Sequence, residues 1–313
     1  MKKPFKVLIT DDVHPILIEG LTDLGLHCTY TPEITIEEVR KTIHEYKGIV
    51  VNTKIKMDRG MIELSPQLCF IARLGSGLET IDTEYAGTKG ISVMRSPEGN
   101  RQAVAEHALG MVLSLYNHFI TANTEMRQGL WMREKNRGRE ISGSTVGIVG
   151  FGHTGQQFAK ILSGLDVSVV FYDPYISSWQ KRNHIQRVEL DELQILSDII
   201  SFHVPLTEET QYMCDERFIE KCQKGVTIVN TSRGKVVRLQ HLIAALKSGQ
   251  LGGACLDVFE NEHVSSHTQQ ETTMYEQLYN FNNVVLTPHV AGWTTESKKK
   301  ISEVLLSKIK TIL

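Results

Sequence analysis

Short apolar runs alternate with amphipathic stretches along the first ninety residues. Apolar positions recur at helical spacing over 14–24 and 36–46. The apolar runs themselves occupy residues 5–10, 48–51, 69–75 and 91–94. Strands that alternate with helices in this way predict βα units and a parallel sheet.

A second alternation follows a long segment without helix breakers. The segment runs from 101 to about 128 and predicts one helix, and another helix is expected over 294–313. The apolar runs between them are 144–150, 167–173, 197–204, 225–230, 252–259 and 283–287. Six strands with helical crossovers predict a second, doubly wound parallel sheet, and hence two α/β domains.

Length and charge narrow the choice of function. The chain has 313 residues and a formal net charge of −2, so two domains are expected, with neither a nucleic-acid partner nor an anionic membrane. No apolar run approaches the roughly 20 residues that span a bilayer. Five scattered cysteines without a C-x-x-C pair predict neither disulfides nor a metal site, and they favour a reducing cytoplasm.

The sequence TVGIVGFGHTGQQFAKIL carries a G-x-G-x-x-G motif at Gly150, Gly152 and Gly155. An apolar strand precedes the motif and a helical pattern follows it, which is the context that dinucleotide binding requires. Asp173 ends the next strand, 23 positions after Gly150, and is expected to accept hydrogen bonds from the adenosine ribose. Its charge would repel a 2′-phosphate, so NAD is predicted over NADP. The alternative is that the glycines serve only a tight turn.

Polar residues follow several strands of the second series, where an open α/β sheet binds its ligands. They are His203, Arg233, Asp257, Glu262 and His289. An arginine can hold the carboxylate and carbonyl of a 2-keto acid, a histidine can supply a proton, and a carboxylate beside the imidazole favours its protonated form. Each residue alone has a structural alternative, such as a turn histidine or a solvated glutamate.

Several segments together resemble the D-2-hydroxyacid dehydrogenase family, in particular its D-3-phosphoglycerate dehydrogenase-like members. They are ARLGSGLETID, SPEGNRQAVAEHALGMVL, LDELQILSDIISFHVPLTEET, NTSRGKVV, GACLDVFENE and TPHVAGW. The resemblance implies that Arg233, Glu262 and His289 are catalytic and that Asp257 binds the nicotinamide amide.

The resemblance also implies two sets of binding residues. The predicted cofactor contacts are Gly150, Gly152, His153, Thr154, Gly155, Asp173, His203, Pro205, Thr210, Thr231, Arg233, Asp257, His289 and Gly292. The predicted substrate contacts are Asn52, Gly75, Ser76, Gly77, Arg233 and His289.

The family's layout implies a flavodoxin-like substrate domain and a Rossmann NAD-binding domain, each doubly wound, with a cleft between them. The substrate domain would comprise residues 1–97 and 291–313, and the NAD-binding domain residues 98–290. The long helix and the segment RQGLWMREKNRG after it resemble the family's dimer interface, so a homodimer is expected.

Two departures from the family's pattern affect the predicted substrate class and the choice of the glutamate beside His289. Asn52 stands where phosphoglycerate-type members often carry an arginine, which weakens the case for a phosphorylated substrate. The polar segment 263–280 is lengthened and is expected to be a mobile loop. This leaves Glu260 as an alternative to Glu262 beside the histidine.

The predicted function is therefore an NAD-dependent D-2-hydroxyacid dehydrogenase that works as a 2-keto acid reductase. One alternative is a D-3-phosphoglycerate dehydrogenase of serine biosynthesis. A formate dehydrogenase would carry glutamine beside the histidine, where this chain offers glutamate. A third alternative is a non-catalytic NAD-sensing binding protein on the same fold.

Overall fold

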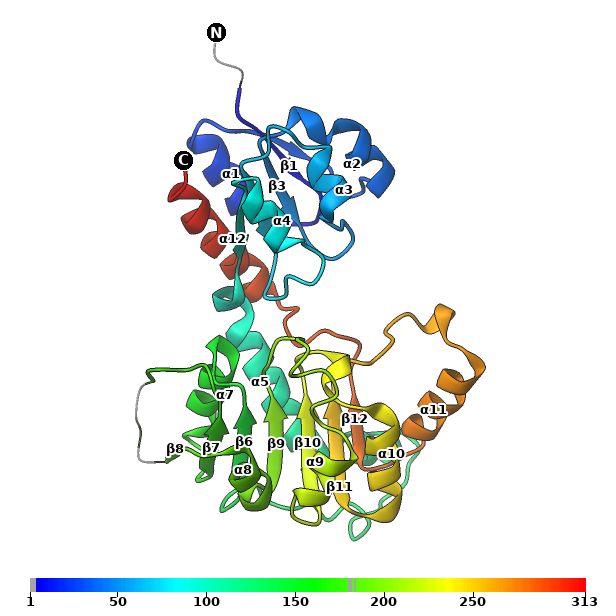
Figure 1. The fold of residues 1–313 in the computed structure, drawn as a ribbon. Coiled ribbons are helices and arrows are strands. Elements are labelled where there is room, and N and C mark those ends of the chain that lie inside the picture. The colour runs from blue at the N-terminus through cyan, green and yellow to red at the C-terminus, as the bar shows by residue number, and fades with distance from the viewer. Residues whose placement is uncertain (1–3, 180–181, 183) are drawn as a thin grey trace. The chain divides into compact units, whose positions relative to one another are not determined.

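The computed structural model describes residues 4–179, 182 and 184–313, and the chain divides into two compact units (Figure 1). Unit 1 comprises residues 1–101 and 293–313, and unit 2 comprises residues 102–292. These limits differ by a few residues from the predicted domain boundaries. Helix α5, Pro97–Tyr116, runs without a break through the limit between residues 101 and 102, so no loop separates the two units there.

Unit 1 is built on a five-stranded parallel sheet in the order β2-β1-β3-β4-β5. The strands are β1 Lys6–Ile9, β2 His27–Tyr30, β3 Gly48–Val51, β4 Phe70–Arg73 and β5 Ser92–Arg95. This is the strand order of flavodoxin-like sheets, so the predicted fold of this unit is confirmed. Strand β2 was not predicted, because it is an edge strand of sequence HCTY with no fully buried position.

Helices cover both faces of this sheet with apolar side chains. They are α1 Pro15–Asp23, α2 Ile36–Thr42, η1 Ile43–Glu45, α3 Arg59–Glu63, α4 Thr83–Thr88 and α12 Thr295–Lys310. The last helix inserts Leu305 and Ile309 into the same core as Leu17 and Leu21 of α1. The C-terminal segment therefore completes the core of the N-terminal unit.

Unit 2 is built on a seven-stranded parallel sheet in the order β12-β11-β10-β9-β6-β7-β8. The strands are β6 Thr145–Val149, β7 Ser168–Tyr172, β8 Ile185–Arg187, β9 Ile199–Phe202, β10 Val226–Asn230, β11 Leu251–Leu256 and β12 Val284–Leu286. The order reverses between β6 and β9, which is where a Rossmann sheet receives its ligand. The pattern predicted six of these strands and missed β8, a three-residue edge strand with one buried position.

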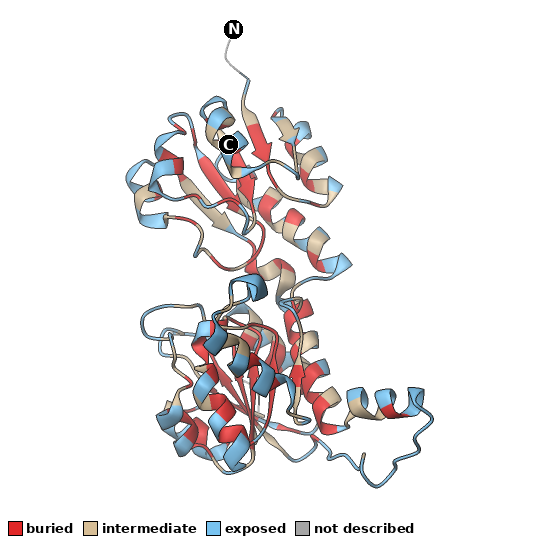
Figure 2. Ribbon diagram, turned by 90° about the vertical axis from the view of Figure 1, so that its right-hand side faces the viewer, coloured by how far each residue is buried: buried red, intermediate tan, exposed pale blue. Residues whose placement is uncertain are grey.

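The strands of unit 2 are mostly buried, and most of the unit's helices pack around them (Figure 2). Besides α5, the helices of this unit are α6 Phe119–Arg127, α7 His153–Leu162, α8 Leu190–Leu196, α9 Glu216–Lys221, η2 Gly234–Val236, α10 Leu239–Ser248, η3 Val264–Ser266 and α11 Gln269–Tyr279. Helix α6 contributes no side chain to the two core clusters of the unit. The prediction of one helix over 101–128 was wrong, because His118 adopts a left-handed backbone (φ 52°) and separates α5 from α6. Within the described residues, every helix is too short or too polar to cross a membrane.

The segment 263–280, predicted to be a mobile loop, contains helix α11 (Figure 1). Thr268 and Glu271 form a capping box at its start, in which each side chain accepts from the other's backbone N–H. Tyr275 and Leu278, three residues apart, are buried on its inner face. The polar composition concealed these two core positions, and the loop prediction is corrected accordingly.

Candidate active site

The glycine motif forms the turn between β6 and α7. Gly150 has φ 89°, and a Cβ there would lie 2.6 Å from the carbonyl oxygen of His203. A Cβ on Gly155 would lie 2.1 Å from the carbonyl oxygen of Gly150. Gly152, the N-cap of α7, has no atom within 4 Å of a built Cβ. The protein's own packing thus requires the outer two glycines, and the middle one leaves open space at a helix N-terminus.

Three further predicted cofactor residues lie on α7 and after β10. His153 is exposed and Thr154 half-buried in the first turn of α7. The buried Thr231, directly after β10, has a hydroxyl with no hydrogen-bond partner among the described residues. An open helix N-terminus suits a pyrophosphate, and an unsatisfied buried hydroxyl suits a polar ligand. These features fit a bound dinucleotide.

Asp173 follows β7, and its carboxylate accepts hydrogen bonds from three backbone N–H groups. Its Oδ2 accepts from the N–H of Phe151 at 2.7 Å, and Oδ1 accepts from the N–H groups of Tyr175 and Ile176 at 2.9 and 3.2 Å. The sequence predicted contacts with ribose hydroxyls for this carboxylate. The structure adds that Asp173 also holds the glycine turn in place through Phe151.

The loop after β9 carries three more predicted cofactor residues. The ring Nε2 of His203 lies 2.9 Å from Oγ of Ser201, and burial lowers the pKa of His203 to about 3. His203 is therefore neutral at physiological pH. Thr210 donates to the carbonyl oxygen of Pro205 at 2.6 Å, which closes the loop on itself.

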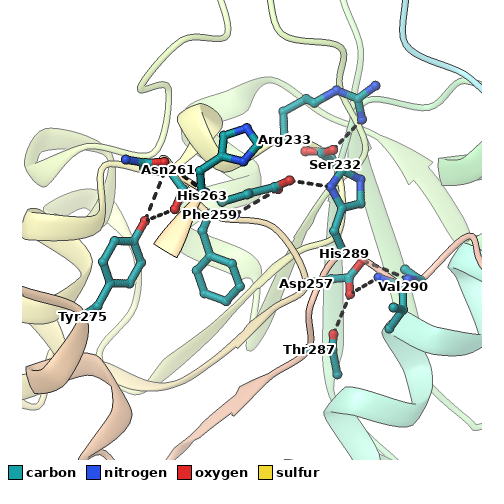
Figure 3. Close-up of polar contacts among 12 residues, drawn as sticks. Ser232, Arg233, Asp257, Phe259, Asn261, His263, Tyr275, Thr287, His289 and Val290 are labelled. Carbon is teal, nitrogen blue, oxygen red and sulfur yellow. Dashed lines mark hydrogen bonds and ion pairs between the residues drawn. The ribbon is translucent and has the colours of Figure 1, made fainter. Parts of the chain in front are cut away.

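Arg233 extends from the loop that follows β10 (Figure 3). Asn230 donates to its carbonyl oxygen at 2.9 Å, and its own Nη1 donates to the carbonyl oxygen of Ser232 at 2.6 Å. A Cβ on Gly234 would lie 1.7 Å from the carbonyl oxygen of Phe259. Only glycine allows this approach, which presses the loop of Arg233 against the loop after β11.

Asp257, at the end of β11, is fully buried beneath His289. Its Oδ1 accepts from the hydroxyl of Thr287 at 2.6 Å and from the N–H of Val290 at 2.9 Å, and Oδ2 accepts from the N–H of Ala291 at 2.9 Å. The expected role for Asp257 was contact with a nicotinamide amide. In the structure this carboxylate also holds the turn after β12.

His289 projects from that turn (Figure 3), and its ring contacts Glu262. Its Nδ1 donates to Oε2 of Glu262 at 2.8 Å, and its N–H donates to the carbonyl oxygen of Asp257 at 2.7 Å. The backbone of His289 is left-handed, with φ 55°. The structure therefore brings together the histidine and the glutamate that the sequence predicted as partners.

The electrostatics of the pair favour an ionised carboxylate. Partial burial alone would raise the pKa of Glu262, but four influences oppose it and the net shift is downward. They are the hydrogen bond from His289, the charge of His289, the N–H of Phe259 and the charge of Arg233. Glu262 is thus a stable anion that accepts from Nδ1 of His289 and orients the imidazole.

Glu260, the other candidate partner for the histidine, has a different role. Its Oε1 accepts from the N–H of Leu239 at 2.6 Å, at the start of α10, and its Oε2 accepts from the hydroxyl of Tyr212 at 2.9 Å. The first four N–H groups of a helix have no partner within it, so Glu260 satisfies one that the helix leaves open. Between the two glutamates, only Glu262 pairs with His289.

The predicted substrate loop lies in unit 1. The N–H of Gly75 donates to Oγ of Ser96 at 3.0 Å, and φ of Gly75 is 130°. Within the described chain no acceptor is recorded for the N–H groups of Ser76 and Gly77, so these two are the better-placed donors of the expected trio. The N–H of Asn52 donates to Asp11 at 3.0 Å, which fixes its backbone after β3.

Some residues of the site escaped sequence reasoning. The ring Nε2 of His107, on α5, lies 2.9 Å from the hydroxyl of Thr287 and 3.6 Å from Asp257. His107 stands in the apolar helical stretch AVAEHALGMVL, where a lone histidine was the only signal. The N–H and the carbonyl oxygen of Asn261, beside Glu262, both bond to Tyr275 of α11. No spacing in the sequence indicates either contact.

The buried cysteines are protonated, because burial raises the pKa of Cys222 to about 12 and the pKa values of Cys214 and Cys255 as well. All five cysteines are free. No group of three or more histidine, cysteine, aspartate or glutamate side chains could hold a metal ion in the part of the chain that the structure describes.

Comparison with known proteins gives a consistent result. Residues 109–291 match the family model "D-isomer specific 2-hydroxyacid dehydrogenase, NAD binding domain". The chain is 35% identical over 273 residues to a hydroxypyruvate reductase of Thermotoga maritima, and the alignment covers 87% of each protein. It is 32% identical over 305 residues to a D-3-phosphoglycerate dehydrogenase of Archaeoglobus fulgidus, and this alignment covers 97% of the chain and 56% of the relative. The chain thus spans about half the length of the curated D-3-phosphoglycerate dehydrogenases it matches.

Solved structures agree with this result. The crystal structure of a D-lactate dehydrogenase from Aquifex aeolicus, complexed with NAD and lactic acid, superposes with a TM-score of 0.81 at 29% identity. The superposition covers 98% of this chain and 94% of that one. A glyoxylate reductase from Paecilomyes thermophila superposes with a TM-score of 0.87 at 25% identity, covering 99% of this chain and 95% of that one.

Proposed function

The chain belongs to the D-isomer specific 2-hydroxyacid dehydrogenase family, and from this premise we propose that it is an NAD-dependent D-2-hydroxyacid dehydrogenase that works as a 2-keto acid reductase. The observation that carries the proposal is the 2.8 Å pair of His289 and Glu262, to which Arg233 adds its charge. All three residues follow the carboxyl ends of strands β10, β11 and β12 in the unit that carries the glycine motif. An acid–base pair and an arginine at a dinucleotide site suit carbonyl reduction.

Each of the three residues has a proposed task. Reduced nicotinamide, when bound, supplies the hydride that reaches the carbonyl carbon. Arg233 holds the substrate carboxylate and polarises the carbonyl, because its guanidinium presents a fork of donors. His289 donates the proton to the carbonyl oxygen, and Glu262 holds the imidazole in its protonated form.

The cofactor is proposed to bind along the ends of β6, β7, β9 and β10. The residues that would hold it are Gly152, Thr154, Asp173 and Thr231, with His203 as a neutral contact. The charge of Asp173 supports NAD over NADP, since a 2′-phosphate beside a carboxylate is repelled.

The substrate is proposed to be a small 2-keto acid without a phosphate group. Asn52 offers a neutral amide, which cannot replace a guanidinium on a phosphate. The N–H groups of Ser76 and Gly77 are the proposed carboxylate donors in unit 1. A phosphorylated substrate, as the name of the Archaeoglobus relative indicates for that protein, is the alternative.

A homodimer is proposed on the basis of an exposed apolar surface, here called the arm. The arm comprises α6 and the residues up to 132, and its exposed apolar side chains are Phe119, Ile120, Met126, Leu130, Trp131 and Met132. Exposed apolar side chains gathered in one segment often mark a protein interface.

A reducing cytoplasm is proposed as the setting, because the five cysteines are scattered along the sequence and form no C-x-x-C pair.

Turnover of 2-keto acids tests the proposed function. NADH consumption would be measured with glyoxylate, pyruvate, hydroxypyruvate and phosphohydroxypyruvate. The wild type should consume NADH with at least one of them. His289→Ala and Arg233→Ala should each lose at least about 100-fold in kcat while NADH still binds. NADH binding by the wild type without turnover of any of the four would instead support an NAD-sensing binding protein.

A further inference from the structure

The peptide that precedes Glu262 is held by the segment that leads from β11 to β12. The hydroxyl of Tyr275 donates to the carbonyl oxygen of Asn261 and accepts from the N–H of Asn261, both at 3.1 Å (Figure 3). Nε2 of His267 also lies 3.1 Å from that carbonyl oxygen. Both polar groups of the Asn261 backbone are therefore bound to one helix and the loop before it.

The side chain of Asn261 is held by the same segment. Its Nδ2 donates to Oε1 of Glu271 at 3.2 Å and to Oγ of Ser266 at 3.3 Å. Its Oδ1 accepts from the N–H of His263 at 3.0 Å. Neither the peptide nor the side chain of Asn261 can turn without breaking several of these hydrogen bonds.

Tyr275 is fixed by its packing. Only 2% of the residue is exposed, its ring stacks on His267 with centroids 4.5 Å apart, and it meets the edge of Phe259 at 6.0 Å. Burial raises the pKa of Tyr275, so the phenol keeps its proton and can donate. The capping box of Thr268 and Glu271 begins the helix that carries Tyr275.

The carboxylate of Glu262 has few contacts of its own. Besides His289 it accepts from the N–H of Phe259 at 3.4 Å, and 38% of its side chain is exposed. An exposed ion pair must hold two side chains in one geometry against their rotamer entropy. The position of this carboxylate therefore depends on how firmly its backbone is held.

We propose that Tyr275 is a positioning residue whose hydroxyl locks the Asn261 peptide and thereby holds the Glu262 carboxylate against His289. The consequence for catalysis rests on the proposed function, whereas the consequence for the protonation of His289 does not. Several other charged or titratable groups lie near the pair or near the segment that holds it. They are Arg233, Glu260, His263, His267, Glu271, Asp257 and His107. None of them is substituted in the variants below, so their charges are the same in every protein that is compared.

The experiment follows the ring of His289 by NMR as a function of pH. Glu262→Gln should lower the pH midpoint of its titration, because the imidazolium loses the carboxylate beside Nδ1. Tyr275→Phe removes only the hydroxyl and should lower the midpoint by a smaller, measurable amount. In a Glu262→Gln background, Tyr275→Phe should lower it no further, because the effect passes through Glu262.

Two more variants make the result decisive. Tyr279→Phe, an exposed tyrosine of the same helix, should leave the midpoint unchanged. Asn261→Ala removes the side-chain hydrogen bonds to Glu271, Ser266 and the N–H of His263 but leaves the backbone bonds to Tyr275, and it should lower the midpoint too. If Tyr275→Phe does not fold, this variant still tests whether the hold on residue 261 reaches His289. An unchanged midpoint in Tyr275→Phe, or in Asn261→Ala where Tyr275→Phe does not fold, or an equal fall in the Glu262→Gln background, would overturn the proposal.

Kinetics separate this inference from the proposed function. If the wild type reduces a 2-keto acid, Tyr275→Phe should lower kcat and move the alkaline limb of its pH profile to lower pH. The KM for NADH should stay unchanged, since Tyr275 touches none of the proposed cofactor residues. If the wild type reduces none, the proposed function fails while the NMR titration still tests the role of Tyr275.

Discussion

Glu262 and His289 form a close ion pair on an exposed rim, where 38% and 48% of their side chains remain accessible. Exposed pairs stabilise a fold by about 0–1 kcal/mol at most. The same contact acts directly on the protonation of the imidazole, because an adjacent carboxylate favours the charged form. We therefore expect the pair to matter more for the pH dependence of activity than for folding.

The first prediction concerns Glu262→Gln. Reduction requires a protonated His289, so its rate should fall as pH rises, and loss of the carboxylate should move that fall to lower pH. The matching measurement is kcat/KM for reduction against pH for both proteins. A limb that stays in place would separate Glu262 from the acid–base function.

A second prediction concerns how the unfolding free energy of the same variant depends on pH. The pKa of Glu262 is lowered in the folded state, so the stabilisation it provides is complete above the ordinary pKa of about 4.5. That contribution is lost as pH falls through the lowered pKa. Wild type and Glu262→Gln should thus differ by under about 1 kcal/mol in unfolding free energy near neutrality. The difference should shrink to nothing in acid, as denaturant titrations at several pH values would show.

A third prediction separates the two tasks of Asp173. Asp173→Asn keeps an oxygen that can accept from the N–H of Phe151 but loses the negative charge, whereas Asp173→Ala loses both. The asparagine variant should relax the preference for NAD over NADP with a small loss of NADH affinity. The alanine variant should also weaken NADH binding, because the glycine turn loses its anchor. Equal preference in wild type and Asp173→Asn would rule out charge as the selector.

Helix α10 depends on a side chain from outside the helix. Its N-cap, Arg238, makes no side-chain cap, and Glu260 accepts from the N–H of Leu239 instead. Glu260→Gln should lower the free energy of unfolding by about 1 kcal/mol, because a charged acceptor is replaced by a neutral one. The alkaline limb of reduction should stay where it is in the wild type. A moved limb would mean that Glu260, and not only Glu262, acts on His289.

The sequence predicted the buried apolar strands. It did not predict the edge strands, the break between α5 and α6, or helix α11. Strands β6, β7 and β9–β12 carry apolar runs because both faces of a parallel sheet are covered. Strands β2 and β8 lie at sheet edges and show little apolar pattern. The break at His118 depends on one backbone angle, and α11 depends on Tyr275 and Leu278 within a polar sequence. Such elements are decided by tertiary contacts that a linear pattern does not contain.

At the scale of the molecule, the sequence predicted the two-unit organisation and the pairing of Glu262 with His289. Segments quoted for the resemblance contain Arg233, Glu262 and His289, so their neighbourhood could be expected from linear order. His107 and Tyr275 could not be identified in this way. His107 reaches the site from a helix through a contact with Thr287, 180 positions away. Tyr275 reaches it from another helix through Asn261, 14 positions earlier, across a polar segment that shows no pattern for the contact.

The proposed dimer gives a prediction at this scale. Trp131, 74% exposed on the arm, should be buried in a homodimer, so Trp131→Asp should convert the dimer to a monomer. Ile195→Asp, at an exposed apolar position on α8, is the matched control and should leave the assembly unchanged. Sedimentation velocity over a range of concentrations measures both. A wild type that sediments as a monomer throughout would remove the basis for the arm as an interface.

The left-handed backbone of His289 bears on how this protein would respond to directed evolution. Such a conformation costs a residue other than glycine about 1–2 kcal/mol, and the exposed pair with Glu262 returns at most about 1 kcal/mol. A library scored for thermal stability alone should therefore enrich glycine at position 289 and discard histidine. The most stable sequences from such a screen would be those that had lost the proposed proton donor.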